Sequence, residues 1–262
     1  MLELEQIKSH FPTHLRDNSS FDKYILKEYL QLMILDFLSG TPHIHKLSFI
    51  GDTNLRLIKR LNRFSEDIDF DCKQVSAEDF ITMTDAIKRF LERSGLEVEA
   101  KGIKNTRLTA FRSNLYFPEL LFNLGISGHK EQRFLIKIEG QDQGIDYTPK
   151  SVNIKGCGFF FPFPVPSDSI LCSMKIAALL SRAKGRDFYD AMFLLSITQP
   201  DYDFLSERSG INNLAELKIA ISELLNKTDL RKKRKDFEHL LFDKSASSKI
   251  LLFRDFIDSL HA

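Results

Sequence analysis

Three aspartates that alternate with apolar residues give this chain its clearest capacity for chemistry. Ile68 and Phe70 separate Asp67, Asp69 and Asp71. The alternation predicts a β-strand with carboxylates on one face and core residues on the other. Carboxylates on one face repel one another unless a cation neutralises them. Because Mg²⁺ binds carboxylate oxygens together with substrate phosphates, the strand indicates a magnesium site.

Two other interpretations of these acids deserve comparison. The simpler one is a solvated strand face whose acids serve only solubility. A calcium-binding loop also fits the spacing of residues 67, 69, 71 and Glu78, but Cys72 stands where that loop needs glycine, so we reject it. A second Asp-x-Asp pair, Asp201 and Asp203, follows Pro200 and is interpreted as a turn.

The segment before the aspartates adds a phosphate site. An apolar strand, Lys46 to Ile50, leads into a turn at Gly51 and a short helix from Thr53 to Asn62. Glycine lets the backbone approach a ligand, and a helix N-terminus offers unpaired N–H groups to phosphates. Thr53 is placed to cap the helix and to offer its hydroxyl. A phosphate turn followed by metal-binding carboxylates predicts two-metal nucleotidyl transfer.

Such chemistry calls for a third carboxylate from a neighbouring strand. The segment "FLIKIEG" offers Glu139, on the same strand face as Lys137. We predict that Glu139 is the third metal ligand and a candidate base; the alternative is an ordinary surface acid.

These residues resemble a known family. The stretch "FIGDTNLRLIKRLNRFSEDIDF" is similar to the AbiEii/AbiGii toxin-type nucleotidyltransferases of the DNA-polymerase-β-like superfamily. The family pattern Arg-x-Ser-x-Asp-Ile-Asp-Phe is matched from Arg63 to Phe70, with Ser65 between Arg63 and Asp67. A second match, "SMKIAALLSRAKGRDFYDAMFLL", supplies the family's lysine and Arg-Asp-x-x-Asp at Lys175, Arg186, Asp187 and Asp190.

The resemblance implies an enzyme that moves a nucleoside monophosphate from an NTP to an acceptor hydroxyl. Asp67 and Asp69 would hold Mg²⁺, and Asp187 would support the active cleft. The implied nucleotide contacts are Gly51, Asp52, Thr53, Ser65, Lys175 and Arg186. The implied acceptor is an RNA such as tRNA, with a protein acceptor left open, and the implied role is a toxin of a toxin–antitoxin or phage-defence pair with a cognate antitoxin.

Asp52 is the one departure from the family turn, which has a second glycine there. A carboxylate beside a triphosphate is electrostatically adverse. Asp52 could point away, help to bind metal, alter nucleotide choice or weaken the enzyme. Two alternatives therefore stay open: an inactive nucleotide- or partner-binding module of the same fold, and a metal-dependent phosphohydrolase.

The elements that must position these residues divide into an α+β part and a helical part. We predict a nucleotidyltransferase palm with an N-terminal helix and a mixed or antiparallel sheet over residues 1–160, and a C-terminal helical domain over 161–262. The proline-rich segment Phe161 to Ser167 is taken as the break between them. We expect a helix from Ser76 with a capping box to Asp79, and basic residues Lys175, Arg182 and Arg186 on one helix face if that helix is continuous. Other expected helices span 20–39, 168–182, 188–197, 214–226, 230–242 and 247–260, and other expected strands lie in "GLEVEAKGI", "NLYFPELLFNLG" and "SVNIKGCGFF".

Composition narrows the classes of partner. The net charge of +1 over 262 residues excludes a global attraction to nucleic acid or membranes, so any such contact needs a local patch. The dense basic run "LRKKRKDF", Leu230 to Phe237, is a candidate RNA contact or, alternatively, a solvated helix face. Three scattered cysteines and the lack of a long apolar run predict a cytoplasmic protein with free thiols and no membrane segment. His43 and His45, predicted to share a strand face, are interpreted as ordinary surface or packing residues.

Overall fold

The computed structural model describes residues 2–103 and 110–261. Contacts divide the chain into two compact units, residues 1–60 with 64–165 and residues 61–63 with 166–262. The short segment 61–63 thus belongs to the second unit although both of its neighbours belong to the first. A functional domain boundary at residue 160 remains a prediction.

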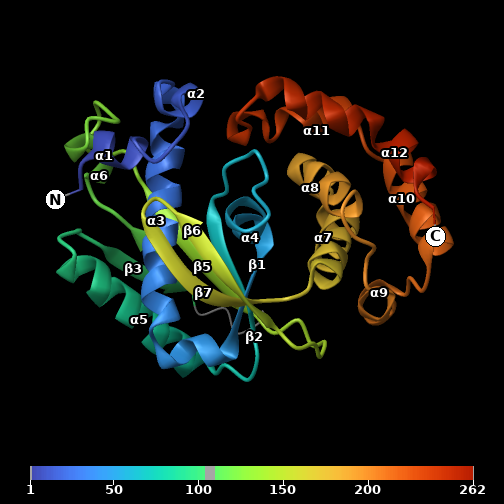
Figure 1. The fold of residues 1–262 in the computed structure, drawn as a ribbon, viewed down its shortest axis with the longest axis horizontal. Coiled ribbons are helices and arrows are strands. Elements are labelled where there is room, and N and C mark those ends of the chain that lie inside the picture. The colour runs from blue at the N-terminus through green and yellow to red at the C-terminus, as the bar shows by residue number, and fades with distance from the viewer. Residues whose placement is uncertain (1, 104–109, 262) are drawn as a thin grey trace. The chain divides into compact units, whose positions relative to one another are not determined.

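A five-stranded mixed sheet forms the centre of the first unit (Figure 1), in the order β1-β2-β5-β4-β3. The strands are β1 (Leu47–Ile50), β2 (Asp67–Cys72), β3 (Glu99–Ile103), β4 (Ala110–Tyr116) and β5 (Leu135–Gln141). Only the β2–β5 pair is parallel; the other three pairs are antiparallel. The predicted α+β class with a mixed sheet is confirmed.

One face of this sheet is apolar and covered. The ring centroids of Phe49 and Phe70 lie 6.2 Å apart on this face, and Phe163 of the hairpin β6–β7 packs on both rings. The hairpin consists of β6 (Lys150–Gly156) and β7 (Phe159–Val165), and the long helix α3 (Asp22–Ser39) packs against β7. Farther along the sheet, Phe80 of α5 (Ala77–Arg93) stacks on Phe111. The opposite face carries the aspartates of β2.

Helix α5 begins as its sequence predicts. The Ser76 hydroxyl accepts the main-chain N–H of Asp79, and the Asp79 carboxylate accepts that of Ser76. This reciprocal capping box needs only residues within one turn. Helix α3 begins differently, because a 3-10 turn (Ser19–Phe21) capped by Asn18 precedes it and no side chain caps α3 itself.

Contrary to expectation, the prolines do not end the regular structure at Phe161: strand β7 continues to Val165, and the boundary between the two units follows Val165, within the predicted segment. Pro162 and Pro164 lie within β7, opposite Asn153 and Ser151 of β6. Alternate N–H groups point to the same side of a strand, and prolines two residues apart therefore remove bonds on one side only. A two-stranded hairpin leaves such a side unpaired. The strand predicted in "NLYFPELLFNLG" covers only the start of that stretch, because β4 ends at Tyr116 and helix α6 (Leu120–Asn123) follows.

The remaining short elements of the first unit surround this framework. They are α1 (Leu4–Lys8), α2 (Thr13–Arg16), the 3-10 helix η2 (Pro42–Lys46) and α4 (Gly51–Leu57). His43 and His45 lie in η2, so the prediction that they share a strand face is wrong. Helix α4 begins at Gly51 and ends earlier than the predicted Asn62.

The described residues of the second unit are mainly helical. Its helices are α7 (Asp168–Arg182), α8 (Gly185–Leu195), α9 (Tyr202–Ser209), α10 (Leu214–Asn226), α11 (Leu230–Lys235) and α12 (Phe253–Ser259), with 3-10 turns η3 (Glu238–Leu240) and η4 (Lys244–Leu252). The bounds of α7 and α10 match the predicted ones. The interpretation of Asp201–Asp203 as a turn is wrong: Asp201 is the N-cap of α9, and its carboxylate accepts the N–H of Phe204.

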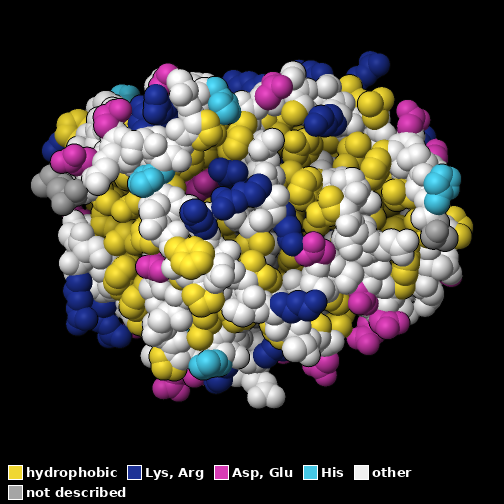
Figure 2. All heavy atoms as spheres, viewed as in Figure 1, with side chains coloured by type: hydrophobic (Ala, Val, Ile, Leu, Met, Phe, Trp, Pro, Cys, Tyr) yellow, Lys and Arg dark blue, Asp and Glu magenta, His cyan; other side chains and the backbone are white. Residues whose placement is uncertain are grey.

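Two features of the surface bear on possible partners. Among the residues that the structure describes, no helix combines the length and the apolar character that a membrane span requires. Figure 2 shows both basic and acidic side chains on the visible face, with several Lys and Arg side chains gathered near the centre of the view.

Candidate active site

The parallel pairing of β2 with β5 brings three carboxylates onto one face of the sheet. In this ladder Asp67 stands opposite Lys137 and Asp69 stands opposite Glu139. Residues paired in this way project from the same face, as do Asp67 and Asp69 two positions apart. All three acids are partly exposed. The side chains that sequence patterns predict as metal ligands are therefore neighbours.

Two cations border these acids. The Nζ of Lys137 lies 3.5 Å from Oδ2 of Asp67, and Nε of Arg112 lies 2.8 Å from Oε1 of Glu139. Burial raises the pKa of Asp67, while the Lys137 charge opposes that rise. Mg²⁺ would compete with both cations for carboxylate oxygens. Three hard oxygen donors on adjacent strands fit the ligand preference of Mg²⁺.

Asp71, the third alternating aspartate, has a different role. It is fully buried and accepts hydrogen bonds from the Tyr147 hydroxyl and, at 2.9 Å, from the main-chain N–H of Gln143. Lys73 lies 4.0 Å from it. Asp71 therefore fixes the segment that follows β5, and the alternation contains one structural and two candidate metal-binding acids.

Two features require glycine at position 51: the backbone conformation there and the closeness of the Asp69 side chain. The φ of Gly51 is 77°, a left-handed conformation that side chains disfavour. A Cβ at this position would lie 2.8 Å from both Cβ and Cγ of Asp69, and closer still to Oδ2. Glycine here allows the Asp69 carboxylate to lie directly over the start of α4.

Thr53 does not cap α4, contrary to the prediction. The N-cap position is Ile50, which makes no side-chain cap, and Thr53 lies inside the first turn. Its buried hydroxyl donates to the carbonyl oxygen of Asp67, and Nδ2 of Asn54 donates to that of Phe49. These bonds tie α4 to the strands on both sides of it. Asp52 is 7% exposed in the same first turn, where a carboxylate interacts favourably with the helix dipole.

Ser65 is 2% exposed, and its Oγ has no hydrogen-bond partner among the described residues. A buried hydroxyl without a partner costs free energy, so it calls for an explanation. A nucleotide or a bound water beside Ser65 would provide one.

The second unit holds the other predicted residues in a buried ionic network. Lys175 of α7 lies 2.9 Å from Asp190 and 3.6 Å from Asp187, both of α8. Arg182 makes two hydrogen bonds to Asp187, at 2.9 and 2.8 Å. Arg63 makes two to Asp190, at 2.8 and 2.6 Å. Each aspartate is thus held by Lys175 and by one arginine.

Arg63 and Arg182 are the functional candidates that sequence reasoning left without a role. Arg63 is 0% exposed, and the segment around it pairs with the helical unit: the N–H of Phe242 donates to Asn62, and Arg63 forms a bridge with Leu241. The sequence signal that could point to this ion pair is that Arg63 and Asp190 both lie in motifs matched to the family pattern. No local pattern connects residues 127 positions apart.

The alignment of Lys175, Arg182 and Arg186 on one helix face was expected only for a continuous helix, and the helix is not continuous. Helix α7 ends at Arg182, Ala183 adopts a left-handed φ of 45°, and α8 begins at Gly185. A Cβ on Gly185 would lie 2.9 Å from the carbonyl carbon of Lys233, so α11 packs directly on the start of α8. Arg186 is half-buried in that first turn.

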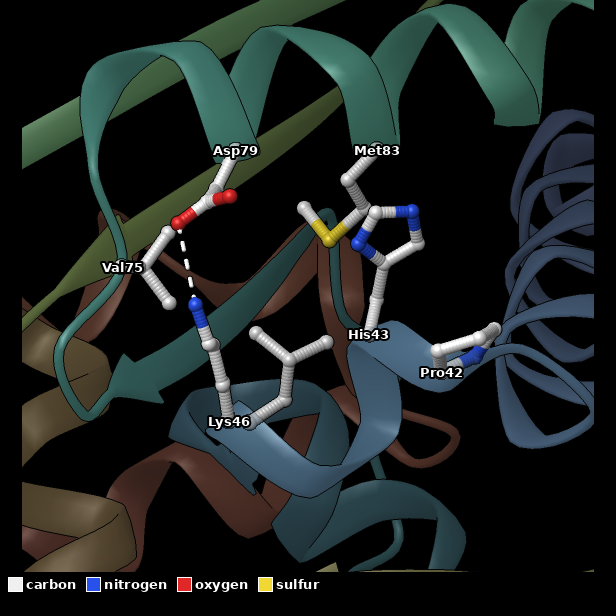
Figure 3. A pocket seen from close by; sticks show the side chains of 7 residues that line it. Pro42, His43, Lys46, Val75, Asp79 and Met83 are labelled. Atoms are coloured by element: carbon white, nitrogen blue, oxygen red, sulfur yellow. Dashed lines mark hydrogen bonds and ion pairs between the residues drawn. The ribbon is translucent and has the colours of Figure 1, made fainter.

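A separate pocket lies at the other end of β1 (Figure 3), with a volume of about 210 Å³. The Nζ of Lys46 and the carboxylate of Asp79 face each other across it at 3.1 Å, beside His43 and Met83. None of the predicted site residues lines it. Because Leu47 of this pocket pairs with Cys72, the pocket lies at the opposite end of β2 from Asp67.

Several solved structures share the fold of this chain. JHP933 from Helicobacter pylori has a TM-score of 0.55 at 18% identity, covering 90% of each chain. MenT4, a nucleotidyltransferase toxin from Mycobacterium tuberculosis, has a TM-score of 0.60 at 16% identity, covering 100% of this chain and 91% of its own. A putative nucleotidyltransferase from H. pylori scores 0.56 at 18% identity, covering 91% and 97%. These similarities establish the fold.

The family follows from the sequence match. Residues 34–260 match the family described as "Nucleotidyl transferase AbiEii toxin, Type IV TA system". The chain therefore belongs to the AbiEii toxin family and is a nucleotidyltransferase, which confirms the resemblance drawn from its motifs. No curated protein is a significant match.

Proposed function

We propose that this protein transfers a nucleoside monophosphate from an NTP to a hydroxyl of an RNA acceptor such as tRNA, with release of pyrophosphate. The observation that carries the proposal is the cross-strand pair of Asp69 and Glu139, with Asp67 on the same face. Neighbouring carboxylates on one sheet face repel one another even with Lys137 and Arg112 beside them, and such a group of oxygens is a ready ligand set for divalent metal.

Asp67, Asp69 and Glu139 are the proposed Mg²⁺ ligands, two ions being the expected number. Bound Mg²⁺ would neutralise triphosphate charge and increase the acidity of the attacking hydroxyl. Gly51 keeps room for the Asp69 carboxylate, and Thr53 holds the start of β2 through the Asp67 carbonyl.

The nucleotide contacts are proposed from the family motifs together with local geometry. Because the Thr53 hydroxyl is engaged, residues 51–53 would contact phosphate through main-chain N–H groups. Ser65 offers a buried hydroxyl with no partner among the described residues. Lys175 and Arg186 are proposed as phosphate-binding residues, and Asp187 as the residue that orients Lys175 and Arg182.

The proposed biological role is that of a toxin restrained by a cognate antitoxin, in a toxin–antitoxin or phage-defence pair. Membership of a type IV toxin family supports this role. So does the shared fold with MenT4, itself described as a nucleotidyltransferase toxin.

The test is transfer of label from each α-³²P NTP to total RNA or to cell protein, with Mg²⁺ and with EDTA. We expect RNA labelling that EDTA abolishes and that Asp69→Asn reduces by at least 100-fold, since a metal ligand is lost. Asp71→Asn is the matched control, because it removes a carboxylate of the same strand that binds only protein groups. Nucleotide binding without transfer would instead support an inactive module, labelled protein would identify a protein acceptor, and label released without an acceptor would indicate a phosphohydrolase.

A further inference from the structure

A basic groove in the second unit lies next to the second family motif. It has a volume of about 450 Å³ and lies between the last turn of α7, the end of α10 and the helix α11. Its charged lining consists of four cations and two acids: Arg182, Lys227, Lys232, Lys233, Asp229 and Asp236. The cations come from three separate elements, so the fold gathers them; a charge run on one solvated helix would not require this.

Helix α11, the basic run of the sequence, is held firmly in place. The backbone at Lys233 leaves no room for a Cβ on Gly185. Phe237, just after the helix, is buried and lies 5.6 Å from the ring of Tyr189 in α8. The carboxylate of Asp229 caps the helix by accepting the N–H groups of Arg231 and Lys232. The basic side chains of α11 are therefore presented from a fixed backbone.

The positive charge of this region exceeds what its acids offset. Lys232 is 87% exposed on its side chain and lies 4.0 Å from Asp229, too far for a strong pair. Arg231 and Lys235 add two exposed cations on the same short helix. Neighbouring cations repel one another, and a polyanion that replaces their counterions gains free energy.

Arg182 links the groove to Asp187 of the neighbouring helix α8, a residue of the second matched motif. It lines the groove, is 41% exposed, and makes the two hydrogen bonds to Asp187. A phosphate in the groove would therefore lie beside a residue that positions Asp187.

We propose that this groove binds the phosphate backbone of the acceptor RNA. The inference rests on the proposed function, because it assigns a surface to the acceptor of that reaction. RNA is favoured over an acidic protein segment because it is the acceptor of the proposed reaction, and cations gathered from three elements suit the closely spaced phosphates of a nucleic-acid backbone. The groove is thus the place at which the basic run, Leu230 to Phe237, would contact RNA.

The experiment compares two charge-matched double variants of the full chain. Lys227→Glu/Lys232→Glu alters the groove, and Lys150→Glu/Lys155→Glu alters two exposed lysines of β6. Binding of fluorescein-labelled total tRNA is measured by anisotropy between 50 and 200 mM salt, alongside KM for RNA and for NTP. Thermal melting checks folding, and the single Lys232→Glu variant, at a highly exposed side chain, serves as the version least able to perturb it.

We expect the groove variant to weaken RNA binding and raise the RNA KM at least tenfold, with an unchanged NTP KM. Its salt slope should fall by about 1.5, since each lost phosphate contact removes about 0.7–0.9. The β6 variant should change affinity less than threefold. RNA binding lost in the groove variant of a protein that transfers nothing would uphold the groove and refute the proposed function. Equal effects of both variants, or a wild-type protein that labels only protein, would overturn the groove assignment while leaving nucleotidyl transfer intact.

Discussion

Replacing Gly51 by alanine tests whether Asp69 is held where the reaction needs it. The added Cβ would lie 2.8 Å from Cβ and Cγ of Asp69, whereas ordinary contacts begin near 3.4 Å. The Asp69 side chain must therefore move by at least about 0.6 Å. Since a misplacement of about 1 Å costs on the order of 100-fold in rate, we expect Gly51→Ala to lose about 10- to 100-fold in kcat/KM for transfer. This loss corresponds to about 1.4–2.7 kcal/mol of barrier.

The alanine at residue 51 also carries a backbone cost that must be separated from the effect on Asp69. The left-handed φ of 77° costs an alanine roughly 1–2 kcal/mol. Gly95 is the matched control: its φ is 86°, and a Cβ there would meet nothing within 4 Å. Gly95→Ala should lose similar stability in urea unfolding but keep full activity.

The assay is label transfer from an α-³²P NTP at saturating Mg²⁺, run beside urea denaturation for both alanine variants. If Gly51→Ala and Gly95→Ala both kept activity within threefold of the wild type, the argument would be refuted, because the contact with Asp69 would then be irrelevant to the chemistry. Loss of activity in both variants would assign the effect to stability.

Three further outcomes are expected. Arg63→Met should destabilise the protein by about 3–5 kcal/mol in urea unfolding, since the fully buried Asp190 carboxylate then has only the ion pair with Lys175 to balance its charge. Adding Asp190→Asn should restore part of this loss. A destabilisation of less than about 1 kcal/mol would contradict the buried network. Asp71→Asn should cost about 1–3 kcal/mol of stability while transfer stays within threefold of wild type, and abolished transfer in a folded variant would place Asp71 in the metal site. Burial raises the pKa of all three thiols to about 12, so the reactive thiolate forms only as the pH rises toward that value. At pH 8 we therefore expect iodoacetamide to alkylate the folded protein at least 100-fold more slowly than the urea-unfolded protein. Equal alkylation rates would show that the fold does not protect the thiols. The thiols are those of Cys72, Cys157 and Cys172.

Features that depend on a few neighbouring residues were predictable from the sequence. The Ser76–Asp79 capping box and the alternation of β2 are of this kind, since one turn or one strand contains all the necessary information. The face shared by Lys137 and Glu139 also followed from their spacing. Its alignment with Asp69 did not, because it depends on a parallel pairing between strands about 70 residues apart.

Predictions failed where a distant element supplied the deciding contact. Two prolines suggested that regular structure ends at Phe161, yet β6 pairs with only one side of β7, and packing against α3 and β1 stabilises the strand. Thr53 has the residue type of a helix cap, but its hydroxyl donates to Asp67. Asp201 has the surroundings of a turn, but it caps a helix that the pattern of apolar residues did not reveal.

The Arg-x-Ser-x-Asp-x-Asp motif serves both units of the fold, and its members should respond differently to mutation. Arg63 belongs to the helical unit and is wholly buried against Asp190, while Ser65, Asp67 and Asp69 belong to the sheet unit. A loss of activity in Arg63→Met must therefore be accompanied by a loss of stability, because the arginine acts through a buried ion pair. A loss of activity in Asp69→Asn should leave the unfolding free energy nearly unchanged or increased, since removing one of three adjacent carboxylates relieves repulsion. Residues matched to a single family motif thus contribute to folding and to chemistry separately, and the comparison of stability with activity assigns each one.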